Sequence, residues 1–145
     1  MPYTDGVRFF GLYPLLYRNG ASSDLAEGVR LAKSRNLTVV ASAWIGRSPQ
    51  ADAENEIQMT GLVELCNEGK VDIACVGSEV LHRGDQTPER LIEMIVRVKR
   101  SLTRQIPVTT ADTYIKWIEN PALIDACDII FFNSYPFWEG VPIND

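Results

Sequence analysis

The chain has 145 residues, of which 46% are apolar and 23% charged, so one sizeable core is expected and wholesale disorder is not. Its 14 basic and 19 acidic side chains give a formal charge of −5, which argues against a nucleic-acid partner because phosphate binding needs clustered Lys and Arg. A single histidine rules out most imidazole-built metal sites, and we expect no metal and no cofactor.

No targeting or membrane segment is visible in the sequence. The amino-terminal residues have neither a basic stretch nor the apolar stretch of a secretory signal, and no apolar run approaches the length of a membrane span. The prediction is therefore no membrane span and, by default, a cytoplasmic location. The three cysteines, which follow no paired spacing, are expected to be reduced, buried thiols: Cys66, Cys75 and Cys127.

The first part of the chain predicts two strands with a helix between them. Val7–Leu12 is a short apolar and aromatic run, typical of a buried strand. Ser22 or Ser23 can cap a helix that runs from Asp24 to about Arg35. Leu37–Trp44 is β-branched and nearly all apolar, which predicts a second buried strand.

The middle of the chain repeats this alternation. Ala53–Cys66 has apolar residues at helical spacing, and Ile57 is expected on its buried stripe. Val71–Gly77 predicts a third strand. Thr87 is placed to cap the next helix, with Pro88 at its first position and apolar residues at helical spacing beyond.

The last part predicts two more strands. Ile106–Thr110 is expected to be the fourth, and Asp128–Asn133 the fifth, with two short helices, Thr113–Glu119 and Pro121–Ala126, between them. Strands that alternate with helices indicate an α/β fold with a parallel sheet, which we expect to be covered by helices on both faces. The order fits an open doubly wound sheet or a (β/α) barrel.

In either architecture, chemistry belongs just past the carboxyl ends of the strands. Polar and aromatic side chains recur at these strand ends: Trp44, Ser78, Glu79, Asp112, Asn133 and Tyr135. Arg8 lies inside the first strand. Each also has a structural reading, since an aromatic ring can pack at a rim and Asp112 can cap the next helix. No phosphate-binding glycine loop and no G-x-S-x-G motif occurs.

Glu79 is the strongest single candidate. It directly follows a buried strand, and we expect partial desolvation to raise its pKa, as suits a general acid near neutral pH. The alternative is a structural ion pair with Arg8 or Arg83. The only histidine, His82, is expected to lie in the loop or first turn that follows.

Five segments together resemble a known family. Val76–Arg83 (VGSEVLHR) resembles the VGNEVLxR segment of glycoside hydrolase family 17, the β-1,3-glucanase family, in its bacterial branch. Four other segments also resemble family segments: Ala43–Ile45 resembles GAWI, Pro107–Asp112 resembles pVTTAD, Asn120–Leu123 matches NPAL, and Asn133–Gly140 resembles NxYPFWEG. All five segments occur in the same order as in the family.

The resemblance implies a partial TIM (β/α)8 barrel in which residues 1–145 form one domain, incomplete at both ends, with about five βα units that match the family's second to sixth strands. It implies that Glu79 is the general acid/base in retaining hydrolysis or transglycosylation of β-1,3-glucan. The nucleophilic glutamate belongs to the family's seventh strand, which these residues do not include. The side chains expected to bind the β-glucan or gluco-oligosaccharide are Arg8, Trp44, Ser78, Arg83, Asp112, Asn133, Tyr135 and Trp138.

One departure and two alternatives bear on this reading. Ser78 stands where the family has an Asn that binds the sugar 2-hydroxyl, so a shorter side chain predicts a weaker contact. A five-stranded sheet cannot close an eight-stranded barrel, and its open edges predict self-association or a partner half. The alternatives are a catalytically inactive carbohydrate-binding remnant and an unrelated flavodoxin-like binding module.

Overall fold

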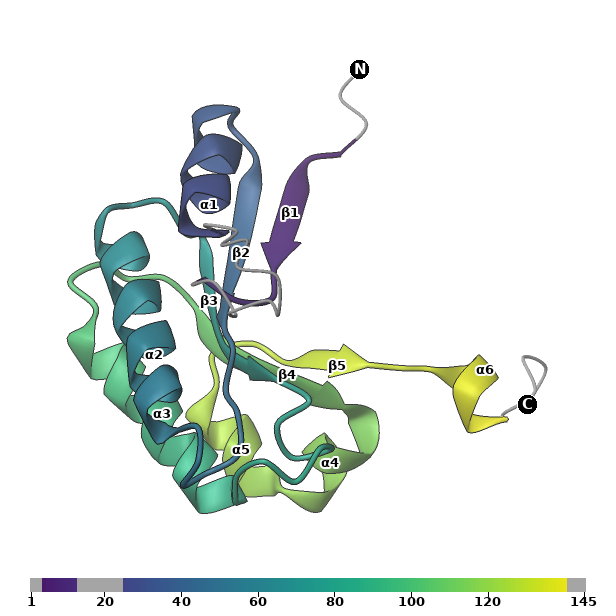
Figure 1. Cartoon of the computed structure of the whole chain (residues 1–145). Coiled ribbons are helices and arrows are strands. Elements are labelled where there is room, and N and C mark those ends of the chain that lie inside the picture. The colour runs from purple at the N-terminus through teal and green to yellow at the C-terminus, as the bar shows by residue number, and fades with distance from the viewer. Residues whose placement is uncertain (1–3, 13–24, 141–145) are drawn as a thin grey trace, which may run out of the picture.

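The computed structural model describes residues 4–12 and 25–140, so the predicted cap at Ser22 or Ser23 lies outside the described residues. Five parallel strands form one sheet in the order β1-β2-β3-β4-β5. They are β1 Gly6–Phe9, β2 Thr38–Ala43, β3 Ile73–Ser78, β4 Val108–Thr113 and β5 Phe131–Asn133. This sequential order, in a sheet that curls into a half-barrel (Figure 1), confirms the partial barrel and excludes the flavodoxin-like alternative, which requires a reversal of strand order.

Six helices are described: α1 Leu25–Ser34, α2 Asp52–Asn67, α3 Pro88–Ser101, α4 Tyr114–Glu119, α5 Pro121–Ala126 and α6 Pro136–Glu139. Figure 1 shows α1, α2 and α3 along one side of the sheet, and each packs on the strands it connects. The prediction that helices cover both faces is wrong. Right-handed crossovers between strands in sequential order all place their helices on the same side, which leaves the concave face without them.

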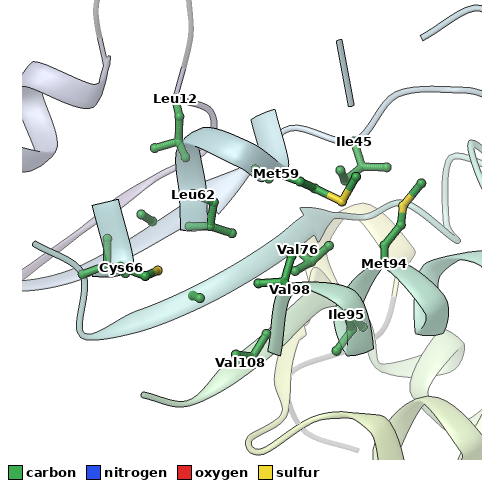
Figure 2. Close-up of a cluster of buried hydrophobic side chains, with 14 of the residues drawn as sticks. Leu12, Ile45, Met59, Leu62, Cys66, Val76, Met94, Ile95, Val98 and Val108 are labelled. Atoms are coloured by element: carbon green, nitrogen blue, oxygen red, sulfur yellow. The ribbon is translucent and has the colours of Figure 1, made fainter. Parts of the chain in front are cut away.

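The core lies between the sheet and these helices. Alternate strand residues, such as Ala41 of β2 and Val76 of β3, point toward α2 and α3 and are fully buried. Figure 2 shows Leu62 of α2 and Ile95 of α3 among the side chains that meet them. Thr87 caps α3 as predicted, because its hydroxyl accepts a hydrogen bond from the Arg90 amide at 3.3 Å.

The buried face of α2 differs from the prediction. Ile57 is 53% exposed, whereas two polar side chains of the same helix, Asn55 and Gln58, are buried. Gln58 accepts hydrogen bonds from the amides of Leu12 (3.0 Å) and Trp44 (3.1 Å), which tie the ends of the first two strand regions to α2. The buried stripe is rotated because these polar groups satisfy loop amides that would otherwise be buried without a partner.

The two outer strands, β1 and β5, each have a single neighbour in the described sheet. Close to β5 the outer surface is apolar, since Phe132 is 62% exposed and Ile118 of α4 is 72% exposed. Large exposed apolar side chains beside an open sheet edge form a surface that is suited to further packing.

All three cysteines are free, as predicted. Cys66 and Cys75 are buried, and Cys127 is partly buried. Burial raises the pKa of the Cys66 thiol to about 12, which keeps it protonated and unreactive. Within residues 4–12 and 25–140, no helix combines the length and apolar character that crossing a membrane requires, and the cellular compartment stays a prediction.

Candidate active site

The end of β3 and the turn that follows it have an unusual backbone. Gly77 has φ +84°, and Glu79 has φ +56°, a left-handed value that side-chain-bearing residues rarely adopt. The register between β3 and β4 also shifts between Cys75 and Ser78. Such irregularities re-aim side chains next to functional sites, and here the shift and the left-handed residue place Glu79 at the carboxyl end of the sheet.

Backbone hydrogen bonds hold this turn against the neighbouring strand. The Glu79 amide donates to the Ala111 carbonyl of β4 at 2.6 Å. The Leu81 amide donates to Asp112 Oδ2 at 2.8 Å, and the Arg83 amide donates back to the Glu79 carbonyl at 2.9 Å. The left-handed backbone is therefore fixed by contacts on both sides of Glu79.

Arg83 braces the same turn from the side of β2. Its guanidinium donates to the carbonyls of Ser78 and Ile45, the latter at 3.0 Å, and its Nε donates to Asp85 Oδ2 at 2.7 Å. The guanidinium also lies 4.6 Å from the centre of the Trp44 ring. In the described part of the chain, Glu79 forms no salt bridge with Arg83 or Arg8, so the structural ion pair considered for it is not present.

The Glu79 carboxyl is held by two donors from the end of the sheet. Asn133 Nδ2, at the end of β5, donates to Glu79 Oε1 at 2.8 Å, and the Tyr135 hydroxyl donates to the same oxygen at 2.7 Å. These bonds bring together three of the predicted site residues from β3, β5 and the segment after β5. The same contact raises the pKa of the Tyr135 hydroxyl, because the phenolate would face a carboxylate.

The pKa of Glu79 was expected to be raised, and this expectation is wrong. The Tyr135 hydrogen bond, followed by that of Asn133, lowers the pKa of the carboxyl, and electrostatic interactions with His82 and Arg83 make smaller contributions in the same direction. Burial acts in the opposite direction but does not prevail, because both donors favour the ionised form. Glu79 is therefore a carboxylate at neutral pH in the described chain.

Arg8 projects from β1 onto the concave face. Its Nη2 donates to Ser78 Oγ at 3.2 Å, and its guanidinium lies 4.4 Å from the centre of the Phe10 ring. Ser78 is nearly buried, and Arg8 Nε is buried without a hydrogen-bond partner among the described residues. Arg8 therefore contacts the residue before Glu79, rather than Glu79 itself.

Asp112 is fully buried in β4. Its Oδ2 accepts from Leu81 and its Oδ1 accepts from the Thr113 amide at 2.8 Å, while burial raises the pKa of the carboxyl. It does not cap the following helix, because the N-cap residue of α4 is Thr113 and no side chain caps this helix. Its contacts are with the backbone around Glu79.

Two aromatic residues are linked to the Glu79 turn, Tyr135 by its hydrogen bond and Trp44 through Arg83, and a third, Trp138, follows on α6. Trp44 is partly buried, Tyr135 is exposed, and Trp138 of α6 is 83% exposed. His82 is also exposed. Among the residues that the structure describes, no group of three or more His, Cys, Asp or Glu side chains could hold a metal ion.

Sequence reasoning missed two residues that support the site. Asn55 Oδ1 accepts from the Gly46 amide at 2.7 Å, and Gln58 accepts from the Trp44 amide, so α2 fixes the loop that carries Trp44. The available signal was the presence of two amide side chains within an otherwise apolar helical stripe, which indicates buried hydrogen-bonding partners.

Comparison with known proteins identifies the family. The family model described as "BtgE/BtgC glycoside hydrolase domain" matches residues 16–145. A glucan 1,3-beta-glucosidase of Schizosaccharomyces pombe is 35% identical over 109 residues, which cover 68% of this chain and 34% of that protein. A second glucan 1,3-beta-glucosidase, from Arthroderma benhamiae, is 30% identical over 117 residues, or 77% of this chain and 36% of that protein.

A solved structure agrees with these relatives. The glycoside hydrolase family 17 beta-1,3-glucanosyltransferase from Rhizomucor miehei superposes with a TM-score of 0.75 and 30% sequence identity, over 99% of this chain and 50% of that chain. The chain thus spans about a third of the length of the curated relatives it matches and half of the solved one. These relatives are fungal, and the assignment to the bacterial branch stays a prediction. The chain belongs to the BtgE/BtgC glycoside hydrolase domain family, and its five strands form part of a barrel of the glycoside hydrolase family 17 type.

Proposed function

We propose that the chain supplies the acid/base side of an active site that cleaves or transfers β-1,3-glucan with retention of configuration, and that Glu79 is the acid/base. The observation that carries the proposal is the placement of Glu79 at a strand end, where Asn133 and Tyr135 both donate to Oε1. The names of the relatives support the substrate class, since they include glucan 1,3-beta-glucosidases and a beta-1,3-glucanosyltransferase whose mutant binds laminaritriose.

The proposed chemistry has two steps. Glu79 first donates a proton to the glycosidic oxygen, while a second carboxylate about 5–5.5 Å away attacks the anomeric carbon and forms a glycosyl-enzyme bond. Glu79, now ionised, then removes a proton from a water molecule or from a sugar hydroxyl, which displaces the second carboxylate. Hydrolysis and transfer differ only in this acceptor. The proposal places the second carboxylate on a part of the barrel other than these five strands.

The hydrogen bonds to Glu79 suit these two roles. Because both donors bind Oε1 of Glu79, the transferred proton is carried by the other carboxyl oxygen, Oε2. The two donors favour the ionised form, which is the form needed in the second step. The first step needs the protonated form, and a negatively charged second carboxylate nearby would raise the pKa of Glu79 toward neutral pH.

Glucan contacts are proposed for side chains at and beyond the carboxyl end of the sheet. The faces of Trp44, Tyr135 and Trp138 can pack against the C–H groups of pyranose rings. Asn133 and Arg8 offer hydrogen-bond donors beside them, and the Ser78 hydroxyl is shared with Arg8. Arg83 and Asp112, in contrast, act on the turn that carries Glu79.

A carbohydrate-binding protein without turnover is the second candidate. It is favoured by the exposed aromatic rings together with Asp112, the carboxylate next to the site on β4, which is fully buried and bound to two backbone amides. Such a side chain cannot serve as a nucleophile without a rearrangement of the turn.

Laminarin hydrolysis and laminaritriose transfer separate the two candidates when the chain is assayed together with the part of the barrel that supplies the second carboxylate. Wild type, Glu79→Gln and a control variant on the exposed face of α2, Glu54→Gln, are compared by product analysis and by calorimetric binding of laminaritriose. Loss of turnover in Glu79→Gln alone, with binding retained, supports the enzyme. Binding without turnover in all three supports the binding protein. If no heat is measured at millimolar ligand, both candidates are rejected.

Self-association is proposed separately from catalysis. The exposed side chains Ile118 and Phe132 lie next to the open edge at β5, and such a surface favours association with a second copy. Sedimentation of wild type and of Phe132→Ser tests this. The proposal requires a concentration-dependent increase in mass that the variant weakens, and it fails if wild type stays monomeric throughout.

A further inference from the structure

Asp112 is the buried carboxylate nearest in the sheet to the turn that carries Glu79. It has no exposed surface, and its two oxygens accept from two backbone amides, Leu81 at 2.8 Å and Thr113 at 2.8 Å. None of the salt bridges in the described part of the chain involves it. A carboxylate buried in this way is costly unless its hydrogen bonds are needed.

The position of the Leu81 amide gives this contact its significance. Leu81 follows Glu79 by two residues, and the Glu79 amide is itself bound to the carbonyl of Ala111, the residue before Asp112. Consecutive residues of β4 therefore hold the chain on both sides of the left-handed Glu79 backbone. A left-handed backbone at a residue with a side chain persists only when its surroundings impose it.

Two other aspartates provide a comparison within the same sheet. Asp72 Oδ2 accepts from the Val39 amide and Asp128 Oδ2 accepts from the Val108 amide, each at 2.8 Å. Both are partly exposed and paired with a lysine, and both lie at the amino-terminal ends of strands. Asp112 has the same type of contact at the opposite end of the sheet, without a lysine, and at the turn that carries the reactive carboxyl.

We propose that Asp112 is a positioning residue, which clamps the Leu81 amide and thereby holds the Glu79 carboxyl against Asn133 and Tyr135. This replaces the direct sugar contact that the family resemblance implies for Asp112. Its importance for turnover rests on the proposed function of Glu79, but the clamp itself can be tested on the chain without any substrate.

Asp112→Asn is the test variant, because it keeps the size of the side chain and replaces one acceptor oxygen by an NH2 donor that faces a backbone donor. Asp128→Asn is the matched control, since it alters the same kind of contact far from Glu79. Carbon-detected NMR follows the titration of the Glu79 carboxyl in wild type and in both variants. The charged or titratable groups that act on Glu79, namely His82, Arg83 and Tyr135, are unchanged in all three.

We expect the Glu79 titration midpoint to rise toward the usual range for glutamate in Asp112→Asn and to stay in place in Asp128→Asn. Amide exchange at Leu81 should be about tenfold faster in Asp112→Asn, as expected for the loss of one buried hydrogen bond. An unchanged Glu79 midpoint in folded Asp112→Asn overturns the proposal, and so does an equal shift in the control. If Asp112→Asn does not fold, wild type decides: a Leu81 amide that exchanges as fast as an exposed loop amide rejects the clamp. Activity enters none of these readouts, so their failure is distinct from failure of the proposed glucan chemistry.

Discussion

Replacing Gly77 by alanine is expected to disrupt the turn that carries Glu79. A Cβ at this position would lie 2.3 Å from Val80 Cγ2, well inside contact distance, and the backbone has φ +84°. Left-handed backbone costs an L-residue roughly 1–2 kcal/mol. Overpacking of a well-filled site costs about 1–3 kcal/mol more. We therefore expect Gly77→Ala to lower the free energy of unfolding by about 2–5 kcal/mol.

Gly84→Ala separates the two contributions. Gly84 lies in the same loop with φ +66°, but the nearest atom to an added Cβ is the tip of the Arg47 side chain at 3.9 Å. This variant should lose only the backbone contribution, roughly 1–2 kcal/mol. Urea unfolding followed by circular dichroism measures both variants against wild type. Equal losses in Gly77→Ala and Gly84→Ala would refute the close packing of Gly77 against Val80.

Two further predictions concern the same site. Tyr135→Phe removes the larger of the two hydrogen bonds that lower the pKa of Glu79, so this pKa should rise in an NMR titration, while Tyr114→Phe serves as an exposed control. A carboxyl whose pKa is lower in the folded state than in the unfolded state stabilises the fold at pH values above its unfolded-state pKa. This stabilisation is lost as the pH falls through the folded-state pKa, so Tyr135→Phe should lose less stability on acidification than wild type. Arg83→Lys keeps the charge, but a lysine cannot bind two carbonyls and stack on Trp44 at the same time. We expect the free energy of unfolding, measured in urea, to fall by about 1–3 kcal/mol. A decrease below about 0.5 kcal/mol, which is typical of a surface substitution, would contradict the bracing role.

The sequence predicted the alternation of elements well, because continuous apolar runs and helical stripes record burial directly. The boundaries of β4 were less accurate: the predicted strand Ile106–Thr110 is observed as Val108–Thr113. The difference arises because its polar residues are buried in the sheet with internal partners, as Thr109 shows by donating to the Ile129 carbonyl at 2.7 Å. Local polarity suggested an end to the strand, and tertiary hydrogen bonds extend it.

Three residues that the structure brings together could be selected from the sequence, but their geometry could not be predicted. Residues at strand ends follow from topology, so Glu79, Asn133 and Tyr135 could be chosen from the sequence alone. Their mutual hydrogen bonds could not, because they depend on the register shift in β3 and on the left-handed backbone of Glu79. For the same reason burial alone gave the wrong direction for the pKa of Glu79, which two distant donors decide.

The strand that supplies Asn133 has three residues, and within residues 4–12 and 25–140 it pairs only with β4. Outer strands of this length open by local fluctuations that leave the rest of a domain folded. Each such opening would release Glu79 Oε1 from Asn133 and carry away the segment with Tyr135, so the carboxyl would briefly become an ordinary exposed glutamate. The contacts of the Glu79 carboxyl therefore depend on β5, and on heating they should be lost at temperatures where β2 and β3 are still intact.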